Sequence, residues 1–175
     1  MNKLIINDAE FKSLVAKICR NIALSDWRPD YVVGITRGGL LPAVMISQYF
    51  DIPCETLKIS LRDGTDQESN LWMAEDAFGY NAAEVGDPLC KNILVVDDIN
   101  DQGSTLNWLM ADWPSGCLPN DARWEHVWNQ NVKFAVVVDN LSSKCNVKMD
   151  FVGMEVNKAE NDVWIEFPYE EWWTK

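Results

Sequence analysis

Apolar and polar positions divide this chain into short strands and helices that follow one another. Apolar side chains recur every three or four residues across residues 9–23, which predicts an amphipathic helix capped by Asn7 or Asp8. Short apolar runs elsewhere predict buried strands with helical segments between them. The predicted strands are Tyr31–Ile35, Pro53–Leu61, Ile93–Val96, Lys133–Val138 and Met149–Val152, and the further helices are Leu40–Phe50 and Ser104–Asp112. This alternation predicts an α/β fold, a parallel sheet with helices on both faces.

Two segments interrupt the pattern. Periodicity is lost over residues 62–91, and we expect part of this region to be a mobile loop, since long loops in compact domains often close over sites. Residues 113–131 carry Trp124 and Trp128 four positions apart, on one face of a predicted helical turn. Large aromatic side chains are usually buried, so packing in the core is favoured over a contact between subunits.

Chemistry-bearing residues follow the central apolar run. Asp97 and Asp98 come directly after Val96, Asp101 follows three positions later, and a Gly-Ser-Thr turn then opens a helix. In α/β proteins this end of a strand is where ligands bind. Carboxylates are hard oxygen ligands suited to Mg²⁺, and a helix N-terminus offers N–H groups to a phosphate. The segment therefore predicts a phosphorylated sugar or a nucleotide as the ligand.

Residues 95–105 resemble the phosphoribosyl-pyrophosphate (PRPP) motif of type I phosphoribosyltransferases, in which apolar residues precede two acids and an Asp-Thr-Gly-x-Thr loop. Residues 33–42 resemble the pyrophosphate-binding loop of that family. Residues 162–170 are similar to the base-binding tail of its bacterial xanthine-guanine branch. The three matches stand in the family's order. The resemblance implies one domain over residues 1–175, with 113–131 as an insertion and 140–175 as a base-binding tail that forms a small hood.

The resemblance also implies roles for individual residues. Asp97 and Asp98 would bind the ribose hydroxyls, directly or through Mg²⁺, and Asp101 would accept the N7 proton of a purine as general base. Arg37 would neutralise the leaving group as a permanent cation, next to a cis peptide bond at Arg37–Gly38. The implied PRPP-binding residues are Asp97, Asp98, Asp101, Gln102, Gly103, Ser104 and Thr105; those for pyrophosphate are Thr36, Arg37, Gly38 and Gly39; those for the base are Trp164, Ile165, Asn140 and Lys144.

Two departures from the family pattern concern the phosphate loop and the base. Gln102 stands where the family usually has Thr. Purine-using relatives place a lysine at the position of Asn140, and here the next lysine is Lys144. Either Lys144 compensates through a longer loop, or the base is recognised in another way. The identity of the base stays open.

The overall expectation is a Mg²⁺-dependent enzyme of nucleotide salvage that transfers a phosphoribosyl group from PRPP to a nucleobase, most simply a purine, and releases pyrophosphate. The alternatives are a catalytically weak PRPP-binding regulator or scaffold and a phosphorelay receiver domain. The receiver is disfavoured because no phosphoacceptor strand follows the acids at the expected distance. Relatives are commonly dimers or tetramers, so we expect a homo-oligomer.

Composition narrows the partners further. A net charge of −12 repels nucleic-acid backbones, and no apolar run approaches the about 18 residues that span a membrane, so neither partner is expected. The five cysteines form no Cys-x-x-Cys pair and the first ten residues do not resemble a signal peptide, which together predict a cytoplasmic protein with reduced thiols. His126 is the sole histidine, which disfavours a Ser-His-Asp hydrolase and a paired-histidine metal site.

Overall fold

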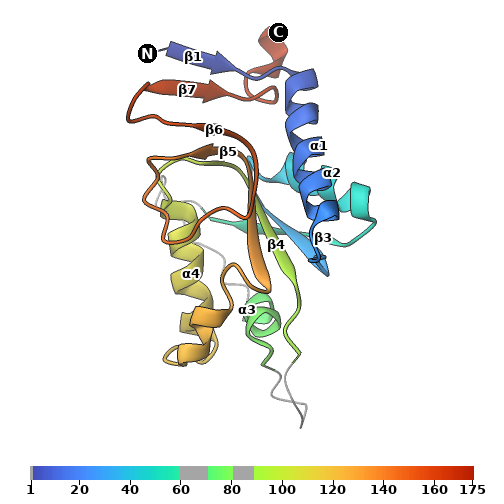
Figure 1. Cartoon of the computed structure of the whole chain (residues 1–175), viewed down its shortest axis with the longest axis vertical. Coiled ribbons are helices and arrows are strands. Elements are labelled where there is room, and N and C mark those ends of the chain that lie inside the picture. Colours follow the sequence, from blue (N-terminus) through green and yellow to red (C-terminus); the bar gives the residue numbers. More distant parts are fainter. Residues whose placement is uncertain (1, 60–70, 81–88) are drawn as a thin grey trace.

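A five-stranded parallel sheet forms the centre of the molecule in the computed structural model, which describes residues 2–59, 71–80 and 89–175 (Figure 1). The strand order is β3-β2-β4-β5-β6, and every neighbouring pair is parallel. The strands are β2 (Tyr31–Thr36), β3 (Cys54–Lys58), β4 (Ile93–Asn100), β5 (Val132–Asn140) and β6 (Phe151–Val156). The middle strands are continuous apolar runs because both faces of the sheet are covered.

Helices cover the two faces of this sheet, so the predicted α/β class is confirmed. On one face α1 (Asp8–Leu24) and α2 (Leu40–Phe50) pack against alternate strand residues such as Val32 and Leu94. On the other face α3 (Leu71–Phe78) and α4 (Ser104–Gly116) pack against the residues between them, such as Val33 and Val95. None of the helices among the described residues has the length and apolar character needed to cross a membrane.

The first helix begins as its sequence predicts. The Asn7 side chain accepts a hydrogen bond from the Glu10 N–H at 2.8 Å, and the Glu10 carboxylate accepts one from the Asn7 N–H at 2.9 Å. This capping box satisfies two N–H groups that have no partner inside the helix. Asn7 rather than Asp8 is therefore the N-cap.

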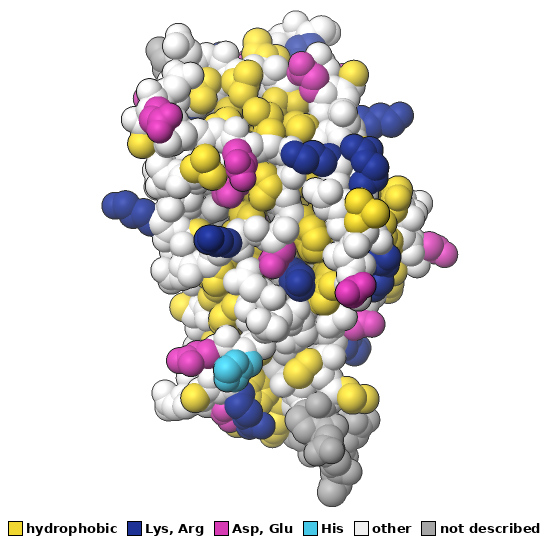
Figure 2. Space-filling model, in the orientation of Figure 1, with side chains coloured by type: hydrophobic (Ala, Val, Ile, Leu, Met, Phe, Trp, Pro, Cys, Tyr) yellow, Lys and Arg dark blue, Asp and Glu magenta, His cyan; other side chains and the backbone are white. Residues whose placement is uncertain are grey.

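A small second sheet forms the hood at the upper end of Figure 1. Strand β1 (Asn2–Ile5) pairs in parallel with β7 (Val163–Glu166), so the start of the chain is attached to its C-terminal tail. Glu166 binds Lys3 at 2.9 Å and Lys175 at 3.3 Å. Hydrophobic side chains gather at this end of the surface shown in Figure 2. The exposed large hydrophobic residues of the hood include Ile5, Trp164, Trp172 and Trp173.

The structure differs from the sequence prediction in several places. Residues 71–78 form helix α3 inside the region expected to lack regular structure, and its Met73 and Phe78 are buried in the core. Residues 62–70 and 81–88 of the expected mobile loop lie outside the described residues, and so do residues 60–61 at the end of the predicted strand Pro53–Leu61. Strand β4 continues through the acids to Asn100 because Asp97 and Ile99 still pair with β5. Strand β6 starts at Phe151 rather than at Met149.

Residues 113–131 contribute to the core, as predicted for their tryptophans. Helix α4 ends at Gly116, and a short 3-10 helix, Ala122–His126, follows. Trp124 is buried, and its ring stacks on that of Trp128 with centroids 5.5 Å apart. Trp128 lies just beyond the 3-10 helix, so the two rings meet through the turn and not along one helical face.

Candidate active site

The loop after β2 and the end of β4 lie against each other at the carboxyl edge of the sheet. A side chain at Gly38 would overlap the Asp98 carboxylate, and one at Gly39 would overlap the Val96 carbonyl oxygen. Only glycine permits this approach, since any Cβ would push the two segments apart. The glycine loop and the acid pair are therefore in direct contact.

The peptide bond between Thr36 and Arg37 is cis. The predicted position of this bond, Arg37–Gly38, is wrong by one residue. The Gly39 N–H donates to the Ile35 carbonyl at 2.8 Å, so the turn already includes Thr36 and reverses the chain earlier than expected. The Arg37 side chain is exposed at this turn, and Thr36 is partly buried.

The carboxylates of Asp97 and Asp98 are partly buried and adjacent. Asp98 accepts hydrogen bonds from the Ile99 N–H and from the Tyr169 hydroxyl, both at 2.8 Å, and Asp97 accepts one from the Asp98 N–H at 2.9 Å. Burial, and then the neighbouring charge of Asp98, raise the pKa of Asp97 well above its usual range. A cation placed beside the pair would remove the repulsion that raises this pKa.

The two carboxylates fit a magnesium site that the protein shares with its substrate. Among the described residues, no group of three or more His, Cys, Asp or Glu side chains could by itself enclose a metal ion. Mg²⁺ is commonly held by one or two carboxylates together with substrate phosphates and water. Asp97 and Asp98 suit such a shared site.

The next loop leads into a helix whose N-terminus is open. Gly103 is the N-cap of α4, with φ of 84°, and no side chain of the described residues caps this helix. The first N–H groups of a helix have no partner within it, and they attract an anion when no cap is present. Ser104 and Thr105 add two hydroxyl groups in the same turn. This N-terminus is therefore suited to a phosphate, in contrast to the capped start of α1.

Behind this turn lies the loop that follows β5. A Cβ on Gly103 would collide with the backbone of Cys145, and the Lys144 N–H donates to the Gln102 carbonyl at 3.2 Å. The Asn107 side chain donates to the Lys144 carbonyl at 3.0 Å and so fixes the same contact from α4. The two loops support each other through their backbones.

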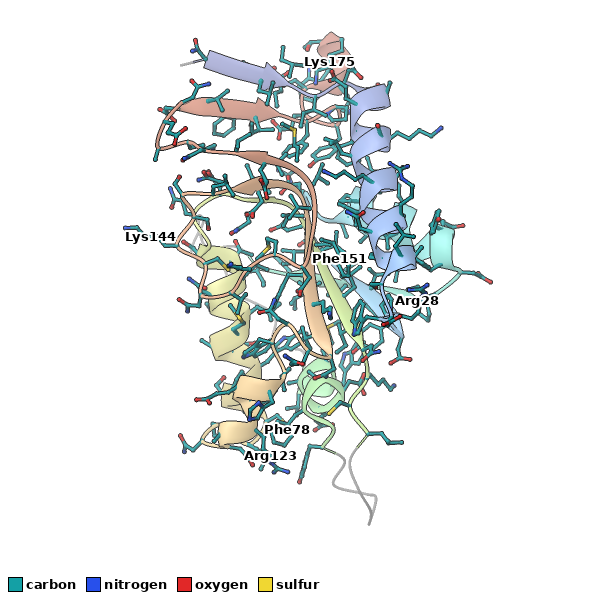
Figure 3. All side chains as sticks on the ribbon, viewed as in Figure 1. Arg28, Phe78, Arg123, Lys144, Phe151 and Lys175 are labelled. Atoms are coloured by element: carbon teal, nitrogen blue, oxygen red, sulfur yellow. The ribbon has the colours of Figure 1, made fainter. Side chains whose placement is uncertain are left out.

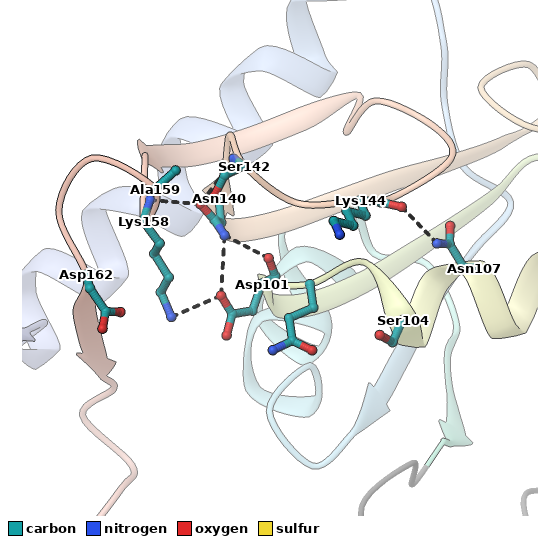
Figure 4. A pocket seen from close by; sticks show the side chains of 10 residues that line it. Asp101, Ser104, Asn107, Asn140, Ser142, Lys144, Lys158, Ala159 and Asp162 are labelled. Atoms are coloured by element: carbon teal, nitrogen blue, oxygen red, sulfur yellow. Dashed lines mark hydrogen bonds and ion pairs between the residues drawn. The ribbon is translucent and has the colours of Figure 1, made fainter.

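A pocket of about 680 Å³ opens beside the acidic loop. Its wall is formed by three parts of the chain, namely the start of α4, the loop after β5 and the loop after β6 (Figure 4). The lining residues include Asp101, Gln102, Ser104, Asn140, Lys144 and Lys158. Its size lies within the range typical of small-molecule sites.

Asn140 connects these three parts of the chain through hydrogen bonds. This side chain is only 5% exposed; its Nδ2 donates to the Asp101 carbonyl at 2.8 Å, and its Oδ1 accepts from the Lys158 N–H at 3.0 Å. Oδ1 also accepts from the backbone N–H and the hydroxyl of Ser142. The amide is thus fully engaged by the protein, and it positions the loops around the pocket.

Comparison with known families identifies the class. Residues 4–171 match the family described as "Phosphoribosyl transferase domain". The chain belongs to the phosphoribosyltransferase family. It is an enzyme of that class, and the predicted resemblance to its bacterial xanthine-guanine branch is supported by the relatives below.

Individual relatives of this phosphoribosyltransferase cover most of its length. The xanthine-guanine phosphoribosyltransferase of Idiomarina loihiensis is 28% identical over 140 residues, which are 79% of this chain and 70% of that protein. The purine phosphoribosyltransferase of Pyrococcus horikoshii Ot3 matches with a TM-score of 0.65 at 20% identity and covers 98% of this chain and 96% of its own. The xanthine-guanine-hypoxanthine phosphoribosyltransferase of Helicobacter pylori gives 0.66 at 17% identity, with 99% and 97% covered. These two structures agree with the fold of this phosphoribosyltransferase.

The fold brings most of the predicted site residues together. The predicted PRPP residues and the predicted pyrophosphate loop meet at the Gly38–Asp98 contact, and Gln102 and Ser104 line the pocket. Lys144 also lines the pocket, but its side chain is exposed and extends from its loop at the left edge of Figure 3.

The predicted base-binding residues of the tail are placed less directly. Trp164 is 42% exposed on β7 and is not among the residues that line the described pocket. Ile165 is buried in the hood, where it pairs with Leu4 of β1. Their contacts with a base stay a prediction.

Sequence reasoning missed two residues of this site. Tyr169, in the C-terminal tail, donates to Asp98, and its ring stacks on Phe167 with centroids 5.6 Å apart. Lys158, in the loop after β6, places its Nζ 3.0 Å from Oδ1 of Asp101. Tyr169 stands within the recognised tail and could have been noted there, whereas no local pattern distinguishes Lys158 from other loop lysines.

Proposed function

We propose that this enzyme transfers the phosphoribosyl group of PRPP to the N9 atom of a purine base and releases pyrophosphate. One observation carries the proposal. The uncapped N-terminus of α4 stands directly after two adjacent carboxylates, and the glycine loop after β2 is packed against one of them. A phosphate site, a hydroxyl and cation site and a second anion site thus follow one another along the edge of the sheet.

Each part of PRPP has a counterpart along this edge. The 5′-phosphate lies at the first turn of α4, where N–H groups and the hydroxyls of Ser104 and Thr105 receive it. The ribose hydroxyls face Asp97 and Asp98. The pyrophosphate lies against the loop of residues 36–39, where backbone approaches closely and Arg37 supplies a fixed positive charge.

Mg²⁺ shared between the acid pair and the substrate would supply charge neutralisation for the pyrophosphate as it leaves. The protein residues do the rest of the positioning. Anchoring both ends of the sugar phosphate holds the anomeric carbon for in-line displacement, which is the main source of rate enhancement for such a reaction. Asp97 and Asp98 also favour positive charge that develops on the sugar.

The transfer step forms one bond and breaks one bond. The N9 lone pair attacks C1′ while the bond between C1′ and the pyrophosphate oxygen breaks, and the bonding electrons leave with pyrophosphate. The base carries a proton on N7 as it enters, and the Asp101 carboxylate accepts this proton. The Asp101 side chain is 36% exposed on the pocket wall, where it can reach a bound base.

The test is direct. Purified protein is incubated with PRPP, Mg²⁺ and single purine or pyrimidine bases, and pyrophosphate and nucleotide are quantified. We expect equimolar pyrophosphate and purine nucleotide, with neither formed when the base or Mg²⁺ is omitted. PRPP that binds in calorimetry without turnover on any base would contradict the proposal and favour a regulatory or scaffold role.

We further propose that the protein is cytoplasmic and forms a homo-dimer or homo-tetramer. Sedimentation can test the oligomeric state.

A further inference from the structure

The first turn of α4 lacks the device that holds the first turn of α1. A side chain at the N-cap usually fixes the start of a helix, as Asn7 does for α1. Gly103 has no side chain to offer, and none of the described residues supplies a cap to α4 in its place. Because this helix end stays open, its position depends on contacts from other parts of the chain.

The backbone of residues 144–146, in the loop between β5 and β6, lies directly against this turn. A Cβ on Gly103 would collide with the Cys145 backbone, and the Lys144 N–H donates to the Gln102 carbonyl at 3.2 Å. Residues 144–146 belong to no helix or strand. Their own position therefore depends on the side chains that bind their backbone.

Asn107, one turn into α4, binds this backbone on both sides of Cys145. Its Nδ2 donates to the Lys144 carbonyl at 3.0 Å (Figure 4), and its Oδ1 accepts from the Asn146 N–H at 2.8 Å. The Asn107 N–H donates to the Gly103 carbonyl at 3.0 Å, as helix geometry requires. One residue thus binds Gly103 through its backbone and the facing loop through its side chain.

The same loop is attached to the sheet on its other side. The Ser143 hydroxyl donates to Oδ1 of Asn100 at 2.9 Å and accepts from the Cys145 N–H at 3.2 Å. Asn100 is only 5% exposed, and its Nδ2 donates to the Asp139 carboxylate at 2.8 Å. The Cys145 side chain packs against the hydrophobic core. The loop is therefore a firm support, and Asn107 connects α4 to it.

We propose that Asn107 is a positioning residue for the turn that binds the 5′-phosphate. It holds residues 144–146 against Gly103 and so keeps the first N–H groups of α4 oriented toward the phosphate. The proposal rests on the proposed function, which places this phosphate at α4, and deepens it by naming a residue that acts through a neighbouring loop. The oxygen and the nitrogen of the Asn107 amide are both engaged by that loop, so its effect on the ligand is indirect.

Replacement of Asn107 by alanine separates positioning from folding. Asn107 is only partly buried, and Lys144 and Asn146 are exposed, so water can replace the two lost hydrogen bonds. Alanine also has a higher helix propensity than asparagine. Asn107→Ala should therefore leave the stability of the folded state almost unchanged while the loop becomes free to move away from Gly103.

The experiment uses two ligands that report on opposite ends of PRPP. Ribose 5-phosphate carries only the 5′-phosphate, and pyrophosphate with Mg²⁺ represents only the leaving group. In calorimetry of Asn107→Ala, we expect the dissociation constant of ribose 5-phosphate to rise roughly tenfold and that of pyrophosphate to stay within about twofold of the wild type. In turnover, KM for PRPP should rise by a similar factor with kcat within about threefold, since the contact serves ground state and transition state alike.

Three further variants support the assignment. Asn107→Gln keeps a donor and an acceptor on a longer side chain and should retain part of the affinity for ribose 5-phosphate. Ser143→Ala releases the same loop from the sheet and should weaken ribose 5-phosphate by about threefold without affecting pyrophosphate. The matched control is Asn21→Ala, which replaces an exposed asparagine of α1 and should bind both ligands as the wild type does.

Two results would overturn the proposal. It fails if Asn107→Ala binds ribose 5-phosphate as tightly as the wild type, and it fails if both ligands weaken equally, because the whole edge of the sheet would then have loosened. If Asn107→Ala does not fold, as judged by circular dichroism, unchanged binding in Ser143→Ala decides against the proposal. A wild type that binds ribose 5-phosphate but forms no nucleotide from any base rejects the proposed function alone. A wild type that binds neither ligand rejects both.

Discussion

The loop that opens α4 consists of consecutive residues, whereas the pocket beside it is assembled from segments far apart in the chain. Residues 97–105 carry both the acid pair and the phosphate turn on one strand–loop–helix unit. The pocket needs Asp101, Asn140 and Lys158 from three different loops, joined by side-chain contacts. We call these regions the phosphate side and the base side.

The geometry of the phosphate side is constrained by its local sequence, whereas the geometry of the base side is set by how distant loops pack together. On the phosphate side, the proposed phosphate site depends on glycines and backbone N–H groups, and few other residue types could replace those glycines. On the base side, the contacts join side chains from three loops that lie far apart in the sequence.

Asp101 is the point where the two sides meet, so its loss should have the largest effect. Asp101→Asn keeps the shape of the side chain but cannot accept the N7 proton, and we expect kcat to fall by about 10²- to 10⁴-fold. PRPP affinity should change far less, since the backbone of the loop is untouched. Single-turnover kinetics and PRPP calorimetry measure the two quantities.

Asp26→Asn, an exposed aspartate after α1, is the matched control and should behave as the wild type. Wild-type turnover in Asp101→Asn would contradict the general-base role. A parallel loss of PRPP affinity and turnover would instead assign Asp101 to the phosphate side alone.

Gly103→Ala tests the phosphate side by itself and should have the next largest effect. Gly103 has φ of 84°, a conformation that costs a residue with a Cβ about 1–3 kcal/mol, and its Cβ would collide with the backbone of Cys145. We expect the PRPP dissociation constant to rise roughly 10- to 100-fold, with a comparable loss of unfolding free energy in urea. The ratio of kcat/KM between bases should not change.

Gly116→Ala, at the exposed far end of the same helix, is the control for glycine replacement as such. PRPP affinity equal to that of the wild type in Gly103→Ala would show that the open N-terminus of α4 does not hold the phosphate.

Local patterns were enough to predict most of the fold. The span of α2 matches the prediction and that of β2 differs only by the addition of Thr36, because a buried strand and an apolar helix are each recognisable over a few residues. The extension of β4 to Asn100 was missed because its last residues are polar, and only pairing with β5 keeps them in the sheet. Helix α3 was missed because eight residues give too short a pattern to distinguish from its irregular surroundings.

The same reasoning applies to the site. The candidate residues of the phosphate side could be named one by one because their motif is contiguous, and their roles stay a prediction. On the base side the candidates Asn140 and Lys144 were chosen by position in the sequence, and the structure shows Asn140 as a buried support. The contacts of Lys158 with Asp101 and of Tyr169 with Asp98 depend on how distant loops pack, which no spacing along the chain encodes.

Tyr169→Phe tests a contact that crosses from the C-terminal tail to the phosphate side. It removes the hydroxyl that donates to Asp98 at 2.8 Å but keeps the ring that packs on Phe11 and Phe167. Loss of a hydrogen bond to a charged group costs about 1.5 kcal/mol, so we expect a roughly tenfold rise in KM for PRPP with little change in kcat.

Tyr49→Phe, whose ring is exposed on α2, controls for the loss of a hydroxyl. An unchanged KM in Tyr169→Phe would mean that Asp98 is positioned by the β4 backbone alone. The tail would then contribute only to the base side.

The smallest effect is expected from the ion pairs that close the hood. Hydrogen bonds from Lys3 and then Lys175 lower the pKa of Glu166 below its ordinary value of 4.5. A carboxylate with a lowered pKa stabilises the folded state above its ordinary pKa, and this contribution is lost as the pH falls through the lowered value. Between about pH 6 and about pH 3, the thermal midpoint of the wild type should therefore fall slightly more than that of Glu166→Gln, which has no carboxylate to protonate at this position.

The control is Glu160→Gln, which replaces an exposed glutamate in the loop before β7 and should keep the wild-type pH profile. If Glu166→Gln and the wild type have parallel pH profiles, the β1–β7 pairing holds the hood without help from charge, and its attachment is a matter of backbone hydrogen bonds and apolar packing.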